Sequence, residues 1–219
     1  MSFPAILALE DGRQFEGIGV GAKAESYGEV VFNTGITGYQ EIFTDPSYCG
    51  QIVILTNPEI GNYGANGSDS ESARPYIEGL VVREFSEIAS NWRSSEHAAD
   101  FLAKQSIPII AEIDTRALVR HLRTEGAMRG VISSLETDPS NLVEKARSIP
   151  TMAGLDLATS VSTKQRYEWT KGVEACSPSE IVEPAAEPSL HVVAYDFGIK
   201  HNILRWLLHS GCRVTVVPS

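Results

Sequence analysis

Residues 191–219 carry the pattern that most limits what this chain can fold into. An apolar run at 191–197 has the length and composition of a buried strand, and Gly198 follows it as a turn. Residues 199–210 then place leucines at helical spacing, and 213–217 form a second, valine-rich run. A strand, a helix and a strand in this order predict a βαβ unit, whose two strands run parallel with a right-handed crossover.

This predicted unit is too small to cover its own sheet. Parallel sheets are normally buried on both faces and contain more than two strands, whereas a single helix covers one face. Partly exposed valines are therefore expected, namely Val192, Val193, Val214, Val216 and Val217. The pattern favours the opening of a larger doubly wound domain whose remainder lies outside this sequence. The alternative is a small satellite that packs on the N-terminal region.

Short strands and helices alternate through the N-terminal region. Asp11-Gly12 separates apolar runs at 4–9 and 13–20 and predicts a hairpin, because both turn positions tolerate positive φ. Asp114 predicts the cap of a helix over 116–125. Further runs predict strands at 30–32, 51–55, 80–82 and 108–113, a helical turn at 39–43, and a helix from Asp138-Pro139 to about Arg147. This alternation predicts an α/β domain.

Residues 174–190 differ in composition from the segments on either side. They contain Pro178, Pro184 and Pro188 together with four glutamates and no basic residue. Prolines interrupt helix and ladder hydrogen bonding, and like charges repel one another. The segment therefore predicts an exposed linker between an N-terminal domain, residues 1–173, and a C-terminal one, residues 191–219.

The charge balance limits the possible partners. The 219 residues carry a net charge of −10, which repels phosphate backbones and argues against nucleic-acid binding. No apolar run is long enough to span a bilayer, and the N-terminus does not resemble a signal peptide. Cys49, Cys176 and Cys212 are odd in number and widely spaced, which is typical of a reducing compartment. We therefore expect a cytoplasmic protein with neither nucleic-acid nor membrane partners.

No residue pattern identifies a catalytic centre by itself. None of the cysteines follows a strand in a tight turn into a helix, where an activated nucleophile is usually presented. The histidines show no metal-ligand spacing, so no metal site is predicted. The turn at Gly198 lacks the further glycines of a dinucleotide-binding loop. These residues alone predict no bound cofactor.

Two polar residues remain as candidates for ligand contact. Lys200 follows the first strand of the βαβ unit, at the edge where doubly wound folds bind ligands, and lies in the first turn of the predicted helix. A cation there faces the positive end of the helix macrodipole, so either a functional role or an ordinary surface lysine fits the placement. Ser47 belongs to the turn Asp45-Pro46-Ser47 and has no visible base partner, so the residues alone favour a simple turn.

Five segments carry a family signature when they are taken in order. They are VVFNTGITGYQEIFTDPSYCGQIVILTNPEIGNYG (30–64), GLVVRE (79–84), IASNWRS (88–94), AEIDTRALVRHLRTEGAMRG (111–130) and HVVAYDFGIKHNILRWL (191–207). Together they resemble the carbamoyl-phosphate synthetase small subunit, the glutamine-hydrolysing chain of that ligase. The resemblance covers nearly the whole chain and is loosest in the acidic linker.

This resemblance implies a swivelling β/β/α domain that contacts a large subunit in a heterodimer, followed by the first βαβ unit of a flavodoxin-like class I glutamine amidotransferase domain. It implies hydrolysis of L-glutamine by a Cys, a His and a Glu through a thioester, with ammonia passing through an internal tunnel. The large subunit then uses bicarbonate and MgATP to make carbamoyl phosphate for arginine and pyrimidine synthesis. The chain itself is expected to hold no cofactor.

The same resemblance places Ser47 beside the glutamine pocket and Lys200 close to that site. The family's nucleophile lies in a G-x-C-x-G-H-Q segment, which does not occur in residues 1–219. We therefore expect the family's function without glutaminase activity from this chain alone. The alternative function is a non-catalytic docking module for the large subunit. A nucleotide-binding α/β domain is disfavoured by the missing glycines.

Overall fold

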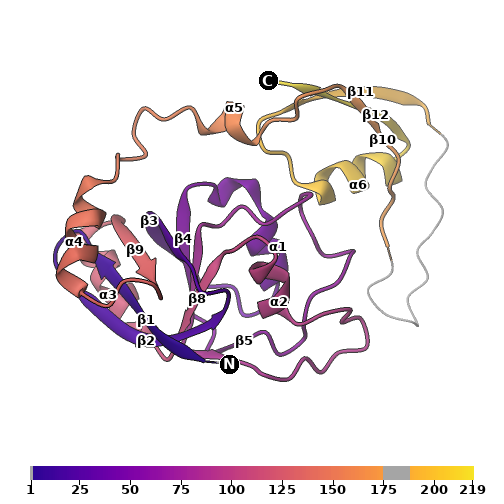
Figure 1. Ribbon diagram of the computed structural model, residues 1–219. Helices are drawn as coiled ribbons and strands as arrows, with labels where there is room; N and C mark the ends of the chain where they lie inside the picture. The colour runs from indigo at the N-terminus through magenta and orange to yellow at the C-terminus, as the bar shows by residue number, and fades with distance from the viewer. Residues whose placement is uncertain (1, 175–187) are drawn as a thin grey trace.

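The computed structural model describes residues 2–174 and 188–219. Most of the predicted linker, together with Cys176, lies outside these described residues. Two regions are seen in Figure 1: a barrel built from the N-terminal strands, and a small sheet built largely from the C-terminal ones. The mixed α/β class predicted from the sequence is confirmed, whereas the closure of the first region into a barrel was not predicted.

The barrel joins neighbouring strands in the order β1-β2-β8-β6-β4-β3-β9. The strands are β1 (Phe3–Leu9), β2 (Gln14–Gly21), β3 (Glu25–Asn33), β4 (Gln51–Leu55), β6 (Gly79–Val81), β8 (Pro108–Ala111) and β9 (Met128–Ser133). The predicted hairpin is confirmed, because β1 and β2 pair antiparallel through a turn in which Gly12 has φ of 100°. The strands β3, β4, β6 and β8 run parallel to one another.

Short helices cover the outside and one end of this barrel. They are α1 (Tyr39–Thr44), the 3-10 turn η1 (Pro46–Tyr48), α2 (Ala98–Ala103), α3 (Thr115–Glu125) and α4 (Pro139–Ser148), and the short strands β5 (Glu59–Ile60) and β7 (Glu84–Phe85) pair with each other. The helix α5 (Leu157–Val161) lies on the connection from α4 to the C-terminal sheet (Figure 1). The predicted cap of α3 is confirmed, since Asp114 Oδ1 accepts a hydrogen bond from Ala117 N at 2.9 Å. Asp138 caps α4 in the same way, through Ser140 N at 2.9 Å.

The barrel strands β4, β6 and β8 are buried on both faces. Side chains that point inward form one core cluster, in which Ile54 and Ile110 pack with Leu118 of α3. Side chains that point outward from β4, β6 and β8, such as Val53, form a second cluster beneath α1 and α2. Ala8 and other residues of β1 and β9 pack under α4. This double burial explains why β4 is apolar throughout and does not alternate.

The C-terminal sheet has the strand order β10-β12-β11. The predicted βαβ unit is confirmed: β11 (Leu190–Asp196) and β12 (Cys212–Pro218) pair parallel, and α6 (His201–His209) connects them. The third strand, β10 (Tyr167–Trp169), was not predicted and pairs antiparallel with β12. It comes from residues before the linker, so the sheet includes part of the segment assigned to the N-terminal domain.

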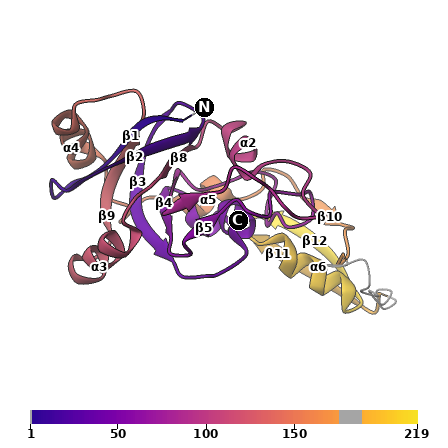
Figure 2. The same ribbon diagram turned by 90° about the horizontal axis from the view of Figure 1, so that it is seen from below.

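Only one face of this sheet is covered by a helix, and Figure 2 shows α6 lying along it. Val214 and Val216 are fully buried there with Leu204 and Trp169. On the opposite face Val193 is 51% exposed and Tyr195 is 65% exposed. The predicted partial exposure is therefore correct for Val192, Val193 and Val217. It is wrong for Val214 and Val216, which α6 and β10 cover.

Among the described residues, no helix combines the length and the apolar character that a membrane crossing requires.

Candidate functional site

The structure brings Ser47 and Lys200 to the same carboxylate. Asp45 Oδ1 accepts a hydrogen bond from the backbone N–H of Ser47 at 2.9 Å, and Asp45 Oδ2 lies 2.6 Å from Lys200 Nζ. Asp45 is 6% exposed, whereas Ser47 is exposed and Lys200 is partly exposed. A buried acid therefore fixes two residues that are 153 positions apart in the sequence numbering (200 − 47) and leaves both accessible.

The loop around Ser47 owes its shape to two local signals. Asp45 is the N-cap of η1, and Pro46 occupies the first position of that turn, where its fixed φ suits a helical start. The Asp45 side chain then accepts from a backbone N–H two residues later, as Asp commonly does in turns. The turn predicted from Asp45-Pro46-Ser47 is thus confirmed, and its carboxylate has a second partner that the sequence did not indicate.

The turn before Lys200 is shaped by Asp196 and Gly198. The buried Asp196 accepts hydrogen bonds from the N–H groups of Gly198 and Ile199 through Oδ1, at 3.0 and 2.9 Å. Gly198 has φ of 91°, and a Cβ at this position would lie 3.0 Å from the Cβ of Pro46. Glycine is therefore required here both by the backbone conformation and by the close approach of the Ser47 loop.

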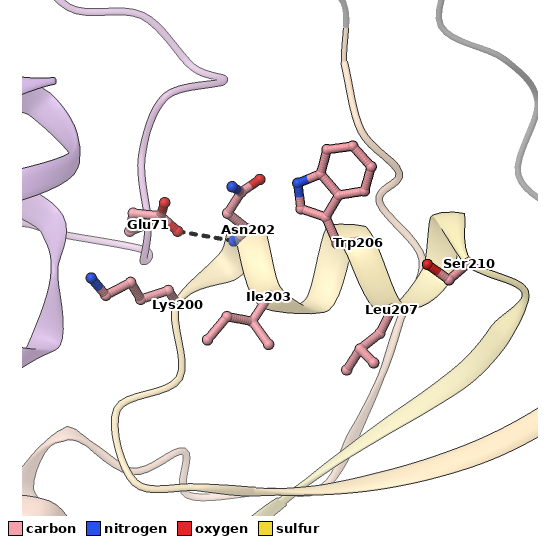
Figure 3. A pocket seen from close by; sticks show the side chains of 7 residues that line it. All are labelled: Glu71, Lys200, Asn202, Ile203, Trp206, Leu207 and Ser210. Carbon is pink, nitrogen blue, oxygen red and sulfur yellow. Dashed lines mark hydrogen bonds between the residues drawn. The ribbon is translucent and has the colours of Figure 1, made fainter.

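Glu71 caps helix α6 in place of the N-cap residue, Lys200. Lys200 is the N-cap residue and makes no side-chain cap bond. The helix begins at His201, two residues later than the predicted start at residue 199. Glu71 Oε2 accepts from Asn202 N at 2.9 Å, as Figure 3 shows, and the Glu71 carbonyl oxygen accepts from His201 N at 2.9 Å. We call Asp45, Glu71, Lys200 and the first turn of α6 the clasp.

The electrostatics of the clasp favour a charged lysine. The hydrogen bond from Lys200 to Asp45 raises the pKa of Lys200. A cation at the N-terminus of α6 is opposed by the helix dipole, and the carboxylates of Asp45 and Glu71 offset that opposition. The unfavourable placement of Lys200 noted in the sequence therefore has two acidic neighbours that stabilise it.

A pocket of about 450 Å³ begins at the clasp and follows the exposed side of α6. Its lining, drawn in Figure 3, consists of Glu71, Lys200, Asn202, Ile203, Trp206, Leu207 and Ser210. Glu71 and Asn202 lie at the end nearest Lys200, and Trp206, Leu207 and Ser210 lie further along the helix. The pocket can therefore hold a polar group against Lys200 with an apolar surface beside it.

Sequence reasoning missed Asp45 and Glu71 as parts of this site. Asp45 was visible as a turn residue, and its second role depends on a lysine from a distant segment. Glu71 contacts α6 across 131 positions, and no local pattern around it indicates a helix cap. Cys49 is partly buried with its Sγ 3.8 Å from Ser160 Oγ, and Cys212 is buried. Within residues 2–174 and 188–219, no group of His, Cys, Asp and Glu side chains is arranged to hold a metal ion.

Comparison with known proteins gives a consistent family signal. Residues 7–132 match the family model described as carbamoyl-phosphate synthase small chain, CPSase domain. A carbamoyl phosphate synthase small chain from Syntrophotalea carbinolica is 55% identical over 98% of this chain and 57% of its own length. Another from Thioalkalivibrio sulfidiphilus is 51% identical over 99% of this chain and 57% of its own length. The chain thus spans a little over half the length of these relatives.

Among solved structures, an aminopeptidase from Aneurinibacillus sp. strain AM-1 aligns with 61% of this chain and 32% of its own, at 16% identity and a TM-score of 0.36. A likeness this weak supports no statement about fold or activity.

Proposed function

Because this chain belongs to the carbamoyl-phosphate synthase small-chain family, we propose that it provides part of the glutamine site of a glutamine-dependent carbamoyl-phosphate synthetase. In this role the small subunit hydrolyses L-glutamine, and its ammonia passes to a large subunit that makes carbamoyl phosphate with MgATP. Residues 191–219 are then the opening βαβ unit of a flavodoxin-like amidotransferase domain, and residues 1–173 supply the domain that meets the large subunit.

The clasp is the observation that carries this proposal. Ser47 and Lys200 are the two positions that the family resemblance assigns to glutamine, and both are hydrogen bonded to Asp45. Lys200 is a cation next to open space, which suits the α-carboxylate of an amino acid. The exposed hydroxyl of Ser47 can donate to or accept from a polar group. Their shared anchor fixes the relative position of two ligand contacts from different regions.

The chemical step requires residues that this sequence does not contain. Residues 1–219 lack the G-x-C-x-G-H-Q segment that carries the family's nucleophile. Cys49 and Cys212 do not replace it, since neither follows a strand in a tight turn into a helix. We therefore propose that the 219-residue chain releases no glutamate from glutamine by itself. Glutamate release above a blank, measured on the purified chain, contradicts this.

The glutamine role is tested on a chimera. The chain is extended with the downstream sequence of the Syntrophotalea carbinolica relative and combined with a carbamoyl-phosphate synthetase large subunit. Loss of a hydrogen bond to a charged group predicts that Ser47→Ala and Lys200→Met each lower kcat/KM for glutamine by about tenfold or more. Synthesis with added ammonia should be unchanged. The control Lys23→Met removes an exposed lysine between β2 and β3 of the barrel and should have no effect.

The second candidate function is a docking module for the large subunit without catalysis. The missing nucleophile segment favours it for the 219-residue chain taken alone. Binding of this chain to the large subunit in a pull-down, together with an active chimera, supports both roles for the same residues. A chimera that assembles with the large subunit and shows no glutamine-dependent synthesis leaves docking as the only function.

A further inference from the structure

A second pocket lies at the barrel, far from the clasp. Its volume is about 300 Å³, and its lining consists of Thr34, Thr56, Thr115, Arg116, Val119, Arg120 and Arg123. Four of these residues belong to α3 beyond its first position, and Figures 1 and 2 show α3 and α6 on opposite sides of the molecule. The pocket therefore does not belong to the site of the proposed glutamine function.

The strand topology places this pocket where ligands commonly bind. Thr34 directly follows the last residue of β3, and Thr56 directly follows the last residue of β4. The two strands are parallel, so both threonines lie at the carboxyl edge of the same pair. Thr115 follows β8, which runs parallel to β6 and β4. In parallel sheets and in barrels with parallel strands, ligands bind outside the carboxyl ends.

Three arginines without acidic partners among the described residues lie together on one helix at this pocket. Arg116, Arg120 and Arg123 are exposed, and no acidic side chain lies within ion-pair distance of them in the described part of the chain. Ion pairs form instead at Arg13, Arg93, Lys104, Arg129, Lys145, Arg147, Arg166 and Lys200. In a chain with net charge −10, a local group of cations without acidic partners is unexpected.

Helix stability explains Arg123, which lies in the last turn of α3, but not Arg116 and Arg120. Arg116 is in the first turn, where a cation faces the positive end of the macrodipole, and the carboxylate of the N-cap residue Asp114 is bonded to Ala117 N. Arg116 and Arg120 are separated by one helical turn, so their charges repel one another. A bound anion removes both unfavourable terms. Leu118 and Leu122 bury the opposite side of α3 in the barrel core, which fixes the helix that presents the guanidinium groups.

We propose that this pocket binds a phosphate group. Each guanidinium can donate two parallel hydrogen bonds to a tetrahedral oxyanion, and the hydroxyls of Thr34 and Thr56, which follow β3 and β4, line the same pocket and can supply further donors. Donors from a helix and from two strand ends suit a tetrahedral phosphate better than a planar carboxylate. The group can come from inorganic phosphate or from a small phosphate ester.

The test is calorimetric titration of the complete 219-residue chain with inorganic phosphate at low ionic strength. One saturable site is expected, and Arg116→Gln, Arg120→Gln and Arg123→Gln should each weaken phosphate binding by about tenfold. The control Arg213→Gln, in β12 of the C-terminal sheet, removes an exposed arginine with the same change in charge and should alter binding less than about twofold. Thermal unfolding without phosphate verifies that every variant is folded.

Equal weakening by the pocket variants and the control shows general charge attraction and overturns the proposal, as does the absence of saturation. Tighter binding of succinate than of phosphate also overturns it. Methyl phosphate distinguishes the two sources: binding as tight as that of inorganic phosphate identifies an ester, and weaker binding identifies the free anion. Lys200→Met should leave phosphate binding intact, so this result is independent of the glutamine proposal.

Discussion

The barrel and the C-terminal sheet bury their strands to different extents. In the barrel, neighbouring residues of one strand are both inaccessible, as for Val53 and Ile54, because the two faces of β4 meet separate cores. In the C-terminal sheet, Val214 is buried beneath α6 while Val193 on the other face is half exposed. The closed barrel therefore carries its own stability, whereas the sheet depends more on its contacts with the rest of the chain.

The clasp is the principal polar contact between these two regions. Asp45 and Glu71 come from the N-terminal region, and their carboxylates bind Lys200 and the first turn of α6. This contact caps α6 and fixes the position of the C-terminal sheet relative to the barrel. The barrel core therefore provides most of the stability of the chain, and the buried side chains of Asp45 and Glu71 position the C-terminal sheet.

The largest difference in stability between the two regions is expected when a large core side chain is removed from each of them. Ile54→Ala in the barrel should lower the free energy of unfolding of the whole chain by about 2–5 kcal/mol, as measured by urea denaturation. Leu204→Ala should instead increase hydrogen exchange in β10, β11 and β12 and leave the barrel amides protected. Loss of barrel protection in the Leu204→Ala variant shows that the two regions unfold as one unit.

A smaller effect is expected from removal of the cap in the clasp. Glu71→Ala leaves the N–H of Asn202 without its acceptor and should lower the local stability of α6 by about 1–2 kcal/mol. Hydrogen exchange of the α6 amides measures this loss. Glu16→Ala, at an exposed position of β2, is the matched control and should change nothing in α6. Unchanged exchange in the Glu71→Ala variant means that the clasp does not hold the helix.

The smallest expected effect is a pH dependence of stability that arises from Glu41 of α1, beside the barrel. Burial raises the pKa of Glu41, and among the described residues its Oε2 has no hydrogen-bond partner. Because the pKa of Glu41 is higher in the folded than in the unfolded chain, protonation of Glu41 stabilises the fold. The stabilisation is fully present below the unfolded-state pKa and is lost as the pH rises through the folded-state pKa. Glu41→Gln should therefore increase stability at pH 7 by less than about 1 kcal/mol.

The urea midpoints of wild type and Glu41→Gln, measured between pH 7 and pH 5, should converge as the pH falls. Glu10 responds in the opposite sense, because the hydrogen bond from Arg129 lowers its pKa, and its contribution is lost only as pH falls through that lowered value. A constant difference between wild type and Glu41→Gln across this range shows that Glu41 does not titrate there.

Local features were predictable from the sequence, and long-range pairing was not. The hairpin at Gly12 and the caps at Asp114 and Asp138 depend on neighbouring residues, and the structure has all of them. Closure of the barrel depends on pairs such as Ile6 with Ser133, which no local pattern specifies. The strand β10 was missed because three residues are too few to show an alternating pattern.

The same division applies to the candidate site. Ser47 and Lys200 were identified through the family resemblance. From the residues alone, Ser47 fitted an ordinary turn and Lys200 fitted an ordinary surface lysine. Their shared contact with Asp45 requires two segments to meet in the folded chain, as does the cap from Glu71. The residues of the site were therefore partly predictable, and the way they are held together was not.

The central claim is that Asp45 acts through Lys200, and a double-mutant cycle on the active chimera tests it most directly. We expect Asp45→Asn to lower kcat/KM for glutamine in the parent background and to have little further effect in the Lys200→Met background, since the partner is already missing. Ammonia-dependent synthesis should remain at the parental level in all the variants. Fully additive losses, or a normal kcat/KM in the Asp45→Asn variant, would contradict the account.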